Sequence, residues 1–532
     1  MLSTVESYTI VGVQALHVYV EVDVGRGLPC LEVVGLPGTA VKEAKDRVRT
    51  AVRNSGFAWP EGRITVNLAP AHVPKAGTFF DLPIALGILS ASGQAPAPPA
   101  GTAVVGELSL DGSVRPVRGA LCIAAAMDGE GLLALPAANA GEVRAVPGLR
   151  FLAVSSVRDL VEKLRMGHRG ERSEGVRAGG EGARPAAPWR SVRGQELAKR
   201  ALTIAAAGRH HIMLVGPPGA GKTMLARTLP ELLEPLSSDE VIEVSAVYSA
   251  AGLLSPECPL IRSRPFRSPH HSVTAAALLG GGAHVRPGEV SLAHRGVLFL
   301  DEFPEFHRAA LEGLREPLEE GAVVISRASG SHRLPAEFTL VATANPCPCG
   351  HRGDPGKTCR CSKAELDRYR RRLSGPLMDR IDLFVYVTRP DVAEVLEGED
   401  APSGAGASVA PEQATSGRGG GTGAREDWRR QMENAVHAQR KRFGNARRRN
   451  GAMTPDEIAA FAALDRTGKA ELARSARDWR LSPRAIHRVL KVARTIADLY
   501  GTENVEVQHV AEALNYRRER AFGDESPGDR EK

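Results

Sequence analysis

The sequence predicts a multidomain α/β fold: an N-terminal α+β domain, a core built on a parallel sheet, and a C-terminal helical domain. Three observations support this division. Residues 166–188 and 398–423 are rich in small and polar residues, which is typical of linkers. Mixed strand and helix patterns change to purely helical ones after residue 425. The length of 532 residues corresponds to about three or four domains.

The predicted regions follow these breaks in chain order. They are the α+β domain (1–165), a flexible linker (166–188), the core (189–392), a low-complexity insertion (393–425), the helical domain (426–522) and a disordered tail (523–532).

The N-terminal domain shows both periodicities. Val18–Val24 alternates apolar and polar residues and predicts a strand, as does the shorter Thr65–Leu68. Ala40–Arg53 has apolar residues at helical spacing and predicts an amphipathic helix. Asp111-Gly112 predicts a tight hairpin turn. Helices are predicted in the last region over Trp428–Phe443, Pro455–Leu464, Gly468–Trp479, Pro483–Tyr500 and Val507–Arg517.

Composition excludes several classes of protein. The sequence contains no run of 18 apolar residues, so no membrane-spanning helix is predicted. The first residues lack the pattern of a signal peptide. Seven cysteines are too few for a disulfide scaffold, so we expect a reducing, cytoplasmic setting. The net charge of +7 is compatible with nucleic-acid binding but does not establish it.

One glycine-rich motif predicts a phosphate-binding loop. The apolar run Ile212–Val215 predicts a strand, and the residues after Thr223 predict a helix. The loop between them fits the P-loop pattern, in which backbone N–H groups and the helix N-terminus face phosphates. Lys222 is expected to reach the β- and γ-phosphates of ATP, and Thr223 to hold Mg²⁺. The motif consists of Gly216, Pro217, Pro218, Gly219, Ala220, Gly221, Lys222 and Thr223.

Two further apolar runs end in polar residues. Val297–Leu300 is followed by Asp301 and Glu302, and Leu340–Ala344 by Asn345. We expect Asp301 to coordinate Mg²⁺ and Glu302 to polarise the attacking water. Asn345 is expected to orient that water, although a turn-forming Asn before Pro346 is an alternative.

Four segments give the chain a specific resemblance. They are Phe266–Ser272, Gly288–His294, Asn345–Gly350 and Ser374–Asp382. With the P-loop and the strand-end residues, they are similar to the ComM/YifB family of magnesium-chelatase-like AAA+ proteins. The resemblance covers the chain apart from the two linkers and the tail.

The resemblance implies roles that the residue pattern alone does not provide. Arg380 falls where relatives place an arginine finger. Such a residue acts on the nucleotide of a neighbouring subunit. This requires a ring, and relatives form hexamers. Arg484 matches the sensor-2 position at the start of a lid helix. A surface ion pair is the alternative for each. The implied function is an ATP-driven DNA motor that branch-migrates recombination intermediates, notably in natural transformation, on branched or single-stranded DNA.

A cluster of cysteines follows Asn345. Cys347, Cys349, Cys359 and Cys361 form two C-x-C pairs separated by nine residues. Four thiolates can hold a tetrahedral structural Zn²⁺. Two disulfides or free thiols remain open, since the pairs are tighter than the usual C-x₂-C spacing.

The N-terminal domain resembles the Lon-protease-type domain at the head of ComM-like chains. Pro74–Pro83 and Gly106–Gly112 carry the resemblance. The positions of the protease's nucleophile and base hold Phe79 and Ile123, neither of which can do that chemistry. We therefore expect a non-proteolytic domain without a catalytic dyad.

Alternative functions stay open at this point. A magnesium-chelatase motor subunit would share the ATPase core but lack the head domain, and an ATP-dependent Lon-like protease is disfavoured by Phe79 and Ile123. A nucleotide-gated scaffold is opposed by Glu302 and Arg380. Two basic runs, Arg368–Arg372 and Arg440–Arg449, are candidate DNA contacts, with internal ion pairs as the alternative.

Overall fold

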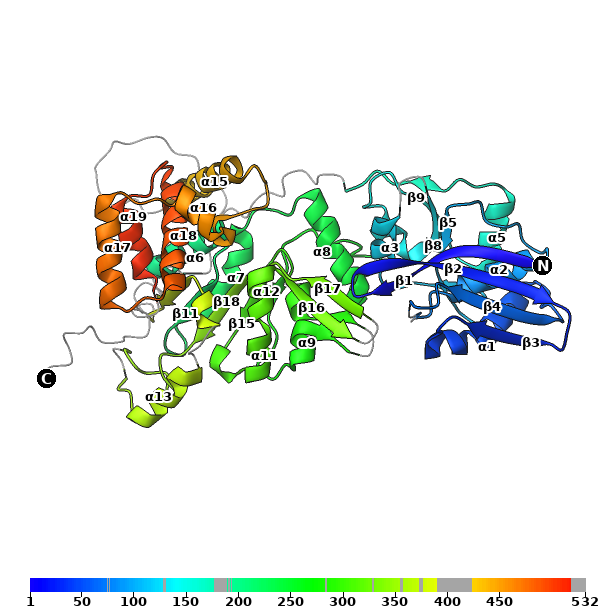
Figure 1. Ribbon diagram of the computed structural model, residues 1–532, viewed down its shortest axis with the longest axis horizontal. Coiled ribbons are helices and arrows are strands. Elements are labelled where there is room, and N and C mark those ends of the chain that lie inside the picture. The colour runs from blue at the N-terminus through cyan, green and yellow to red at the C-terminus, as the bar shows by residue number, and fades with distance from the viewer. Residues whose placement is uncertain are drawn as a thin grey trace, which may run out of the picture.

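The protein is elongated, with three regions in a row (Figure 1). This computed structural model describes residues 1–73, 75, 77–127, 131–176, 189, 192, 194–282, 285–327, 330–354, 357–372, 377–389 and 423–517. The predicted tail, and the predicted insertion up to residue 422, lie outside these ranges. Within these ranges no helix has the length and apolar character needed to cross a membrane.

The head is built on one mixed sheet with the strand order β10-β9-β8-β5-β1-β2-β4-β3. The long β1 and β2 pair antiparallel, and the residues of β1 alternate between buried and more exposed positions, as one covered face requires. The strands are β1 (Leu2–Val11), β2 (Gln14–Gly25), β3 (Cys30–Val34), β4 (Arg63–Ala69), β5 (Thr102–Val104), β8 (Leu132–Pro136), β9 (Arg150–Val154) and β10 (Glu171–Arg172).

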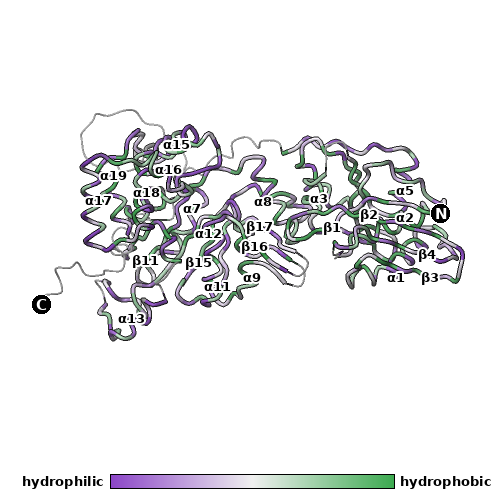
Figure 2. Tube along the Cα trace, in the orientation of Figure 1, coloured by the Kyte–Doolittle hydropathy of each residue, from purple (hydrophilic) through white to green (hydrophobic). Residues whose placement is uncertain are grey.

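Apolar helices cover this sheet. The helix α2 is buried almost throughout, and the tube is mostly green around it in Figure 2. The predicted amphipathic helix exists as α1, with Val41, Val48 and Val52 buried. Asp111-Gly112 turns between the short strands β6 (Glu107–Leu108) and β7 (Val114–Arg115). The helices are α1 (Thr39–Asn54), α2 (Asp81–Ala91), α3 (Ala120–Ala126), α4 (Ala140–Val143) and α5 (Val157–Arg165).

The head extends past its predicted end. β10 pairs antiparallel with β9, so residues 171–172 complete the sheet rather than belong to a flexible linker beginning at 166. The backbone groups of this short segment find partners on the edge of the sheet, a contact between distant residues that local composition does not report.

The core is a five-stranded sheet, parallel throughout, with the order β12-β15-β18-β11-β19. Its central strands are fully buried, which explains their unbroken apolar sequences. The strands are β11 (Ile212–Val215), β12 (Phe266–Arg267), β15 (Val297–Leu300), β18 (Thr339–Ala344) and β19 (Leu383–Tyr386).

Helices and two small hairpins surround the core sheet. The hairpins are β13 (Gly280–Gly281) with β14 (Arg286–Pro287), and β16 (Ala322–Arg327) with β17 (Gly330–Pro335). The helices are α6 (Glu196–Gly208), α7 (Lys222–Leu232), α8 (Ser238–Ala251), α9 (Ala275–Leu279), α10 (Glu289–Leu292), α11 (Arg308–Gly313), α12 (Arg315–Glu320) and α13 (Lys363–Arg372), with 3-10 turns η2 (Phe303–Glu305) and η3 (Met378–Arg380).

The C-terminal region is helical, as predicted. Its central helix α18 is capped by Ser482, begins with Pro483 and ends at Gly501, whose φ is 73°. The apolar face of α18 packs against α15, α19 and α6 in one shared core. The helices are α15 (Gly423–Phe443), α16 (Pro455–Phe461), α17 (Arg466–Asp478), α18 (Pro483–Tyr500) and α19 (Val507–Asn515).

The head is bonded directly to the core. The thiol of Cys122 on α3 donates to the carbonyl of Ala246 on α8 at 3.2 Å. The hydroxyl of Ser249 on α8 donates to the buried Glu142 carboxyl at 2.6 Å. Burial raises the pKa of Glu142. The two regions therefore share a buried polar contact besides their covalent connection.

Candidate nucleotide-binding site and cysteine cluster

The glycine-rich loop joins the end of β11 to the start of α7. Gly219 and Gly221 have φ values of 78° and 82°, which favour glycine. The Lys222 ammonium donates to the carbonyls of Gly216 at 2.6 Å and Pro217 at 3.0 Å, and to Asn345 Oδ1 at 3.2 Å. Burial lowers the pKa of Lys222, opposed by the nearby carboxylates. The loop thus holds a half-buried cation at its centre.

Asp301 lies beside this loop at the end of β15. Thr223 Oγ1 donates to Asp301 Oδ2 at 3.0 Å. Thr343 Oγ1 donates to Asp301 Oδ1 at 2.6 Å and accepts from the backbone N–H of Glu302 at 2.9 Å. Thr343 fixes both acidic residues, and it is a site residue that sequence reasoning missed. A threonine near the end of the mostly apolar β18, two residues before Asn345, was the available signal.

Glu302 has an unusual backbone conformation. Its φ of 53° lies in the left-handed region, which costs a non-glycine residue free energy and is common at functional sites. The side chain is 61% exposed, and its carboxylate lies 4.0 Å from His271 Nδ1. The rings of His271 and His270 lie 4.0 Å apart. The strained turn therefore presents a carboxylate at the mouth of the site.

These groups surround a cleft of about 530 Å³ at the carboxyl edge of the sheet. This volume is in the range of small-molecule sites. A Cβ added to Gly219 would meet no atom within 4 Å, so the loop borders open space. The oxygens of Thr223 and Asp301 are ligands that Mg²⁺ prefers. The residues fit a triphosphate with Mg²⁺. Lining residues are Pro218–Met224, Asp301, Glu302 and Thr343–Asn345.

Arg380 and Arg484 do not join this cleft. Arg380 ends η3, just before β19 begins, so it lies at the opposite edge of the parallel sheet from the P-loop. Its guanidinium is 7% exposed and bonds Glu319 at 2.5 Å. Arg484 is the second residue of α18. Its positive charge also acts on Glu319, whose pKa is lowered chiefly by the hydrogen bond from Arg380. The Glu319 carboxylate thus pairs with Arg380 and also interacts electrostatically with Arg484.

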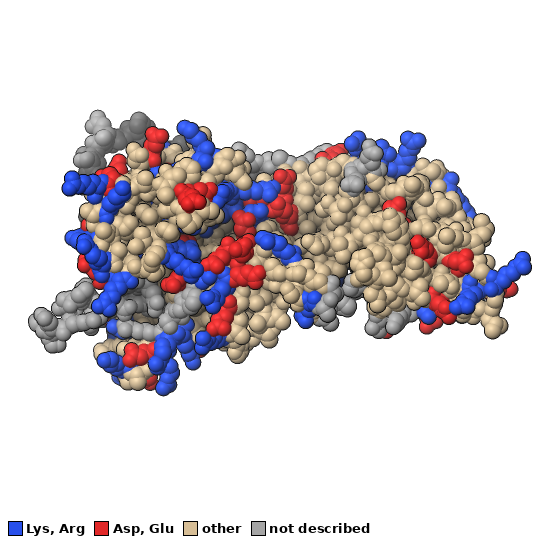
Figure 3. All heavy atoms as spheres, in the orientation of Figure 1, with Lys and Arg blue, Asp and Glu red and all other residues tan. Residues whose placement is uncertain are grey.

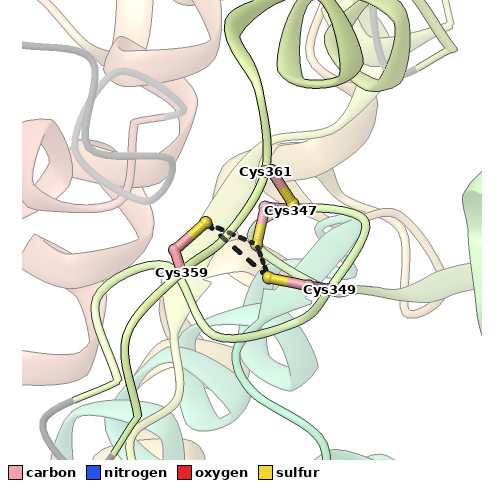
Figure 4. Close-up of side chains that lie close together, drawn as sticks. All are labelled: Cys347, Cys349, Cys359 and Cys361. Atoms are coloured by element: carbon pink, nitrogen blue, oxygen red, sulfur yellow. Dashed lines mark hydrogen bonds between the residues drawn. The ribbon is translucent and has the colours of Figure 1, made fainter.

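The four cysteines of the predicted cluster converge (Figure 4). All four sulfur atoms lie within 4.8 Å of one another. Cys347 Sγ lies 3.4 Å from Cys349 Sγ and 3.6 Å from Cys359 Sγ, and the last two are 3.7 Å apart. A tetrahedral zinc with bonds of about 2.3 Å has sulfur–sulfur edges of about 3.8 Å. The cluster therefore has the dimensions of a four-thiolate zinc site.

The protonation of the cluster is uneven. The backbone N–H of His351 stabilises the Cys349 thiolate and lowers its pKa to about 6. Burial raises the pKa of Cys347 and Cys361. The Cys349 sulfur is thus prepared as an anion beside Cys347 and Cys361, which favour the thiol, and a cation would relieve that difference.

The cysteine loop packs against the nucleotide cleft. A Cβ at Gly350 would meet Pro218 of the P-loop at 2.7 Å. After Cys361 the chain enters α13, where the Tyr369 hydroxyl donates to the carbonyl of Asn345 at 2.9 Å. The cluster therefore anchors the segment that supports Asn345.

The second basic run is occupied by internal ion pairs. Arg442 bonds Asp498 at 2.6 Å, Arg447 bonds Glu243 at 2.7 Å and Arg448 bonds Glu457 at 2.7 Å. Arg440 and Arg449 both bond Glu234. Positive and negative side chains interleave where the core meets the C-terminal helices (Figure 3). The expectation that Arg440–Arg449 contacts DNA is therefore not supported, because acidic residues of the core and of the C-terminal helices pair with these arginines.

The head has no protease-like catalytic pair at the predicted positions. Phe79 is 9% exposed and Ile123 is fully buried. Lys75 is also buried and donates to the carbonyl of Pro70, and burial lowers its pKa. Thr78 donates to Glu107. Lys75 and Thr78 are thus each engaged with other groups.

Three family profiles match the sequence. They are "Magnesium chelatase, subunit ChlI" over residues 188–395, "Subunit ChlI of Mg-chelatase" over 20–139, and "Magnesium chelatase, subunit ChlI C-terminal" over 424–517. The head is thus matched by a magnesium-chelatase profile, and its likeness to Lon proteases stays a prediction.

Relatives match over nearly the full length. The competence protein ComM of Haemophilus influenzae is 41% identical over 526 residues, covering 97% of each chain. The uncharacterized protein YifB of Escherichia coli is 40% identical over 518 residues, again covering 97% of each. Partial matches include a magnesium-chelatase 38 kDa subunit of Rhodobacter capsulatus, 28% identical over 186 residues, 32% of this chain and 53% of that protein. Lon protease 2 of Bacillus subtilis is 29% identical over 183 residues, 30% of this chain and 33% of the protease.

The nucleotide cleft, the parallel sheet and these sequence matches all indicate the same family. The resemblance inferred from the motifs is confirmed over almost the whole chain. The chain belongs to the ComM/YifB family of magnesium-chelatase-like AAA+ proteins.

Proposed function

We propose that the protein is an ATP-hydrolysing ring motor that moves on DNA and branch-migrates recombination intermediates in homologous recombination or natural transformation. The observation that supports hydrolysis best is the convergence of Lys222, Asp301 and Asn345 at one edge of the core sheet. The DNA part of the proposal is supported by the full-length relative named competence protein ComM.

The residues of the cleft divide the work of hydrolysis. Lys222 would leave the carbonyls of its own loop and bind the β- and γ-phosphates, and the backbone of the loop would cradle them. Thr223 and Asp301 would hold Mg²⁺, which when bound neutralises phosphate charge. Glu302 would accept a proton from the attacking water. Asn345, positioned by Tyr369, would orient that water.

Arg380 and Arg484 would act between subunits. Both lie across the sheet from their own cleft, so a ring that seats this edge against a neighbour's cleft would use them in trans. A guanidinium so placed stabilises charge on the transferring phosphoryl group and contributes about 10³–10⁵ in rate where it has been measured. This arrangement supports a ring. We propose a hexamer, as the family resemblance implies, working in the cytoplasm, where ATP and chromosomal DNA are available.

The cysteine cluster would hold one structural Zn²⁺. The sulfur–sulfur distances and the Cys349 thiolate support this assignment. Metal analysis of the purified chain should give about one zinc per subunit. The Cys349→Ser, Cys361→Ser double variant should retain none, and equal, negligible zinc in both proteins would refute the site.

The head would be a Lon-like domain that has lost proteolysis. Its buried Phe79 and Ile123 support this reading. The hydrogen bond of Ser249 to Glu142 links the head to the core of the same chain. A casein-degradation assay with ATP should show no cleavage by the full chain.

The activity can be tested with one variant of the proposed base. Glu302→Gln should bind ATP but lower turnover about 10²–10⁴-fold, because the carboxylate no longer accepts a proton. Glu312→Gln, on the exposed end of α11, is the matched control and should hydrolyse ATP like wild type. Wild-type protein that hydrolyses ATP but binds no DNA at low salt would overturn the DNA role.

A further inference from the structure

The helix α13 contacts Asn345 directly and is linked to Glu302 through Glu305, and these are the two residues proposed to handle the attacking water. Tyr369 donates to the carbonyl of Asn345 at 2.9 Å. Arg372 lies 3.5 Å from the carboxylate of Glu305, which ends the η2 turn. That turn starts at Glu302, whose carbonyl accepts from the N–H of Glu305 at 2.8 Å. A displacement of α13 would therefore be transmitted to both sides of the cleft.

A second cleft lies between α13, η2 and the cysteine loop. Its volume is about 440 Å³, close to that of the neighbouring nucleotide cleft. Glu302 and Asn345 line both clefts, so the second one opens directly onto the proposed hydrolytic groups. On the α13 side its charged lining residues are Glu365, Arg368 and Arg372, and Glu302 and Glu305 line the cleft as well.

The positive charges of this cleft are accessible. Arg368 is exposed, and no ion pair to it is found within the described ranges of the chain. Arg372 and Glu305 are 54% and 50% exposed, so their ion pair at 3.5 Å contributes little. A phosphodiester offers Arg372 a stronger, bidentate partner than a solvated carboxylate. Glu365 accepts from the N–H of Ser362 at 2.8 Å as part of the helix cap. This hydrogen bond is the main cause that lowers the pKa of Glu365, and the charge of Arg368 contributes less.

We propose that α13 binds the phosphate backbone of single-stranded DNA through Arg368 and Arg372, and that this contact controls ATP hydrolysis. DNA phosphate competes with Glu305 for Arg372, and the η2 turn carries the resulting change to Glu302. The inference rests on the proposed DNA-stimulated ATPase and names the element that couples DNA to it. The charge of the helix and its two contacts with the cleft carry the argument.

The test uses the full chain, a single-stranded oligonucleotide, and ATP turnover with and without that DNA. The double variant Arg368→Gln, Arg372→Gln should make the dependence of log affinity on log salt less steep by about 1.4. Each lost phosphate contact on a single strand accounts for about 0.7 of this change. The stimulation ratio should fall toward one. Glu305→Gln should act in the opposite way, raising turnover without DNA toward the stimulated rate. Arg474→Gln, on the outer helix α17, is the matched charge control and should behave like wild type.

The outcomes separate this inference from the function on which it rests. Wild-type chain that neither binds nor is stimulated by DNA overturns both. Wild-type stimulation with an unchanged salt slope and ratio in the double variant overturns the inference alone, as does an unchanged ratio in Glu305→Gln. Loss of stimulation together with a smaller assembly by mass photometry would identify α13 as a subunit contact instead and would also overturn it.

Discussion

Two arginine-rich runs look alike in the sequence and have opposite surroundings in the fold. The run at Arg440–Arg449 lies where the C-terminal helices meet the core, and carboxylates of Glu234, Glu243 and Asp498 bond its guanidinium groups. The run at Arg368–Arg372 lies on α13, where Arg368 is exposed and Arg372 has one weak, solvated partner.

The two runs differ in how many acidic side chains lie close to them and not in their density of positive charge. The helix α8 presents Asp239 and Glu243 to Arg447. The helix α13 follows the cysteine cluster and borders a cleft that opens toward solvent. Arg368 and Arg372 are therefore better candidates for a nucleic-acid contact than Arg442 and Arg449, whose guanidinium groups are largely buried against carboxylates.

Removing the proposed zinc should have the largest effect, and the effect should be confined to the α13 side of the comparison. Structural zinc contributes on the order of 10 kcal/mol to the folding of small domains. Cys359→Ser with Cys361→Ser should therefore raise hydrogen exchange across α13 strongly, while exchange in α17 stays as in wild type. Equal protection of α13 in both proteins would show that the cluster does not anchor it.

Breaking the buried network of the second run should cost nearly as much stability. Asp498 is 1% exposed and accepts from both Arg442 and Arg494. Asp498→Ala leaves two guanidinium groups without this partner and should lower the free energy of unfolding by about 3–5 kcal/mol in urea denaturation. Glu471→Ala, which removes the partner of the exposed Arg474, should cost at most about 1 kcal/mol. Similar costs for the two variants would contradict this account.

The second run should also respond to pH. A hydrogen bond from His294, with the charges of Arg295 and Arg447, lowers the pKa of Glu243 to about 2. Because this pKa is below its unfolded value of 4.5, the stabilisation is present above pH 4.5 and is lost as pH falls through the folded pKa.

The side chain of Glu243 is 36% exposed, so solvent screening should limit the contribution to about 1 kcal/mol. Melting curves of wild type and Glu243→Gln should differ near neutral pH and converge as the pH falls. A gap that stays constant down to about pH 3 would refute the pKa assignment.

The smallest effect should be that of Arg447→Gln on DNA binding. Arg447 is occupied by Asp239 and Glu243, so its removal should cost at most about 1 kcal/mol of stability. The affinity for single-stranded DNA and its salt dependence should equal those of wild type. A salt slope reduced as much as in the α13 variants would erase the distinction between the two runs.

The sequence predicted the parts of the site that local patterns encode. The P-loop, Asp301 and Asn345 each follow an apolar run, and the carboxyl ends of parallel strands bring them to one edge. The short spacing of the cysteines likewise predicted a cluster, which the fold assembles.

Residues that act through distant contacts were not predictable in this way. Thr343 is unremarkable until β15 and β18 pair and place its hydroxyl on Asp301. Glu319 gains its place beside Arg380 only when α12 packs near the end of η3. The true end of the head, at β10, likewise depends on pairing with β9 rather than on composition.

Branch migration itself tests the central claim most directly. Full-length protein should convert a labelled three-stranded or Holliday-junction substrate to its products with ATP and Mg²⁺, and should not do so with ADP or as Glu302→Gln. Wild-type protein that hydrolyses ATP yet leaves the junction in place under the same conditions would contradict the account.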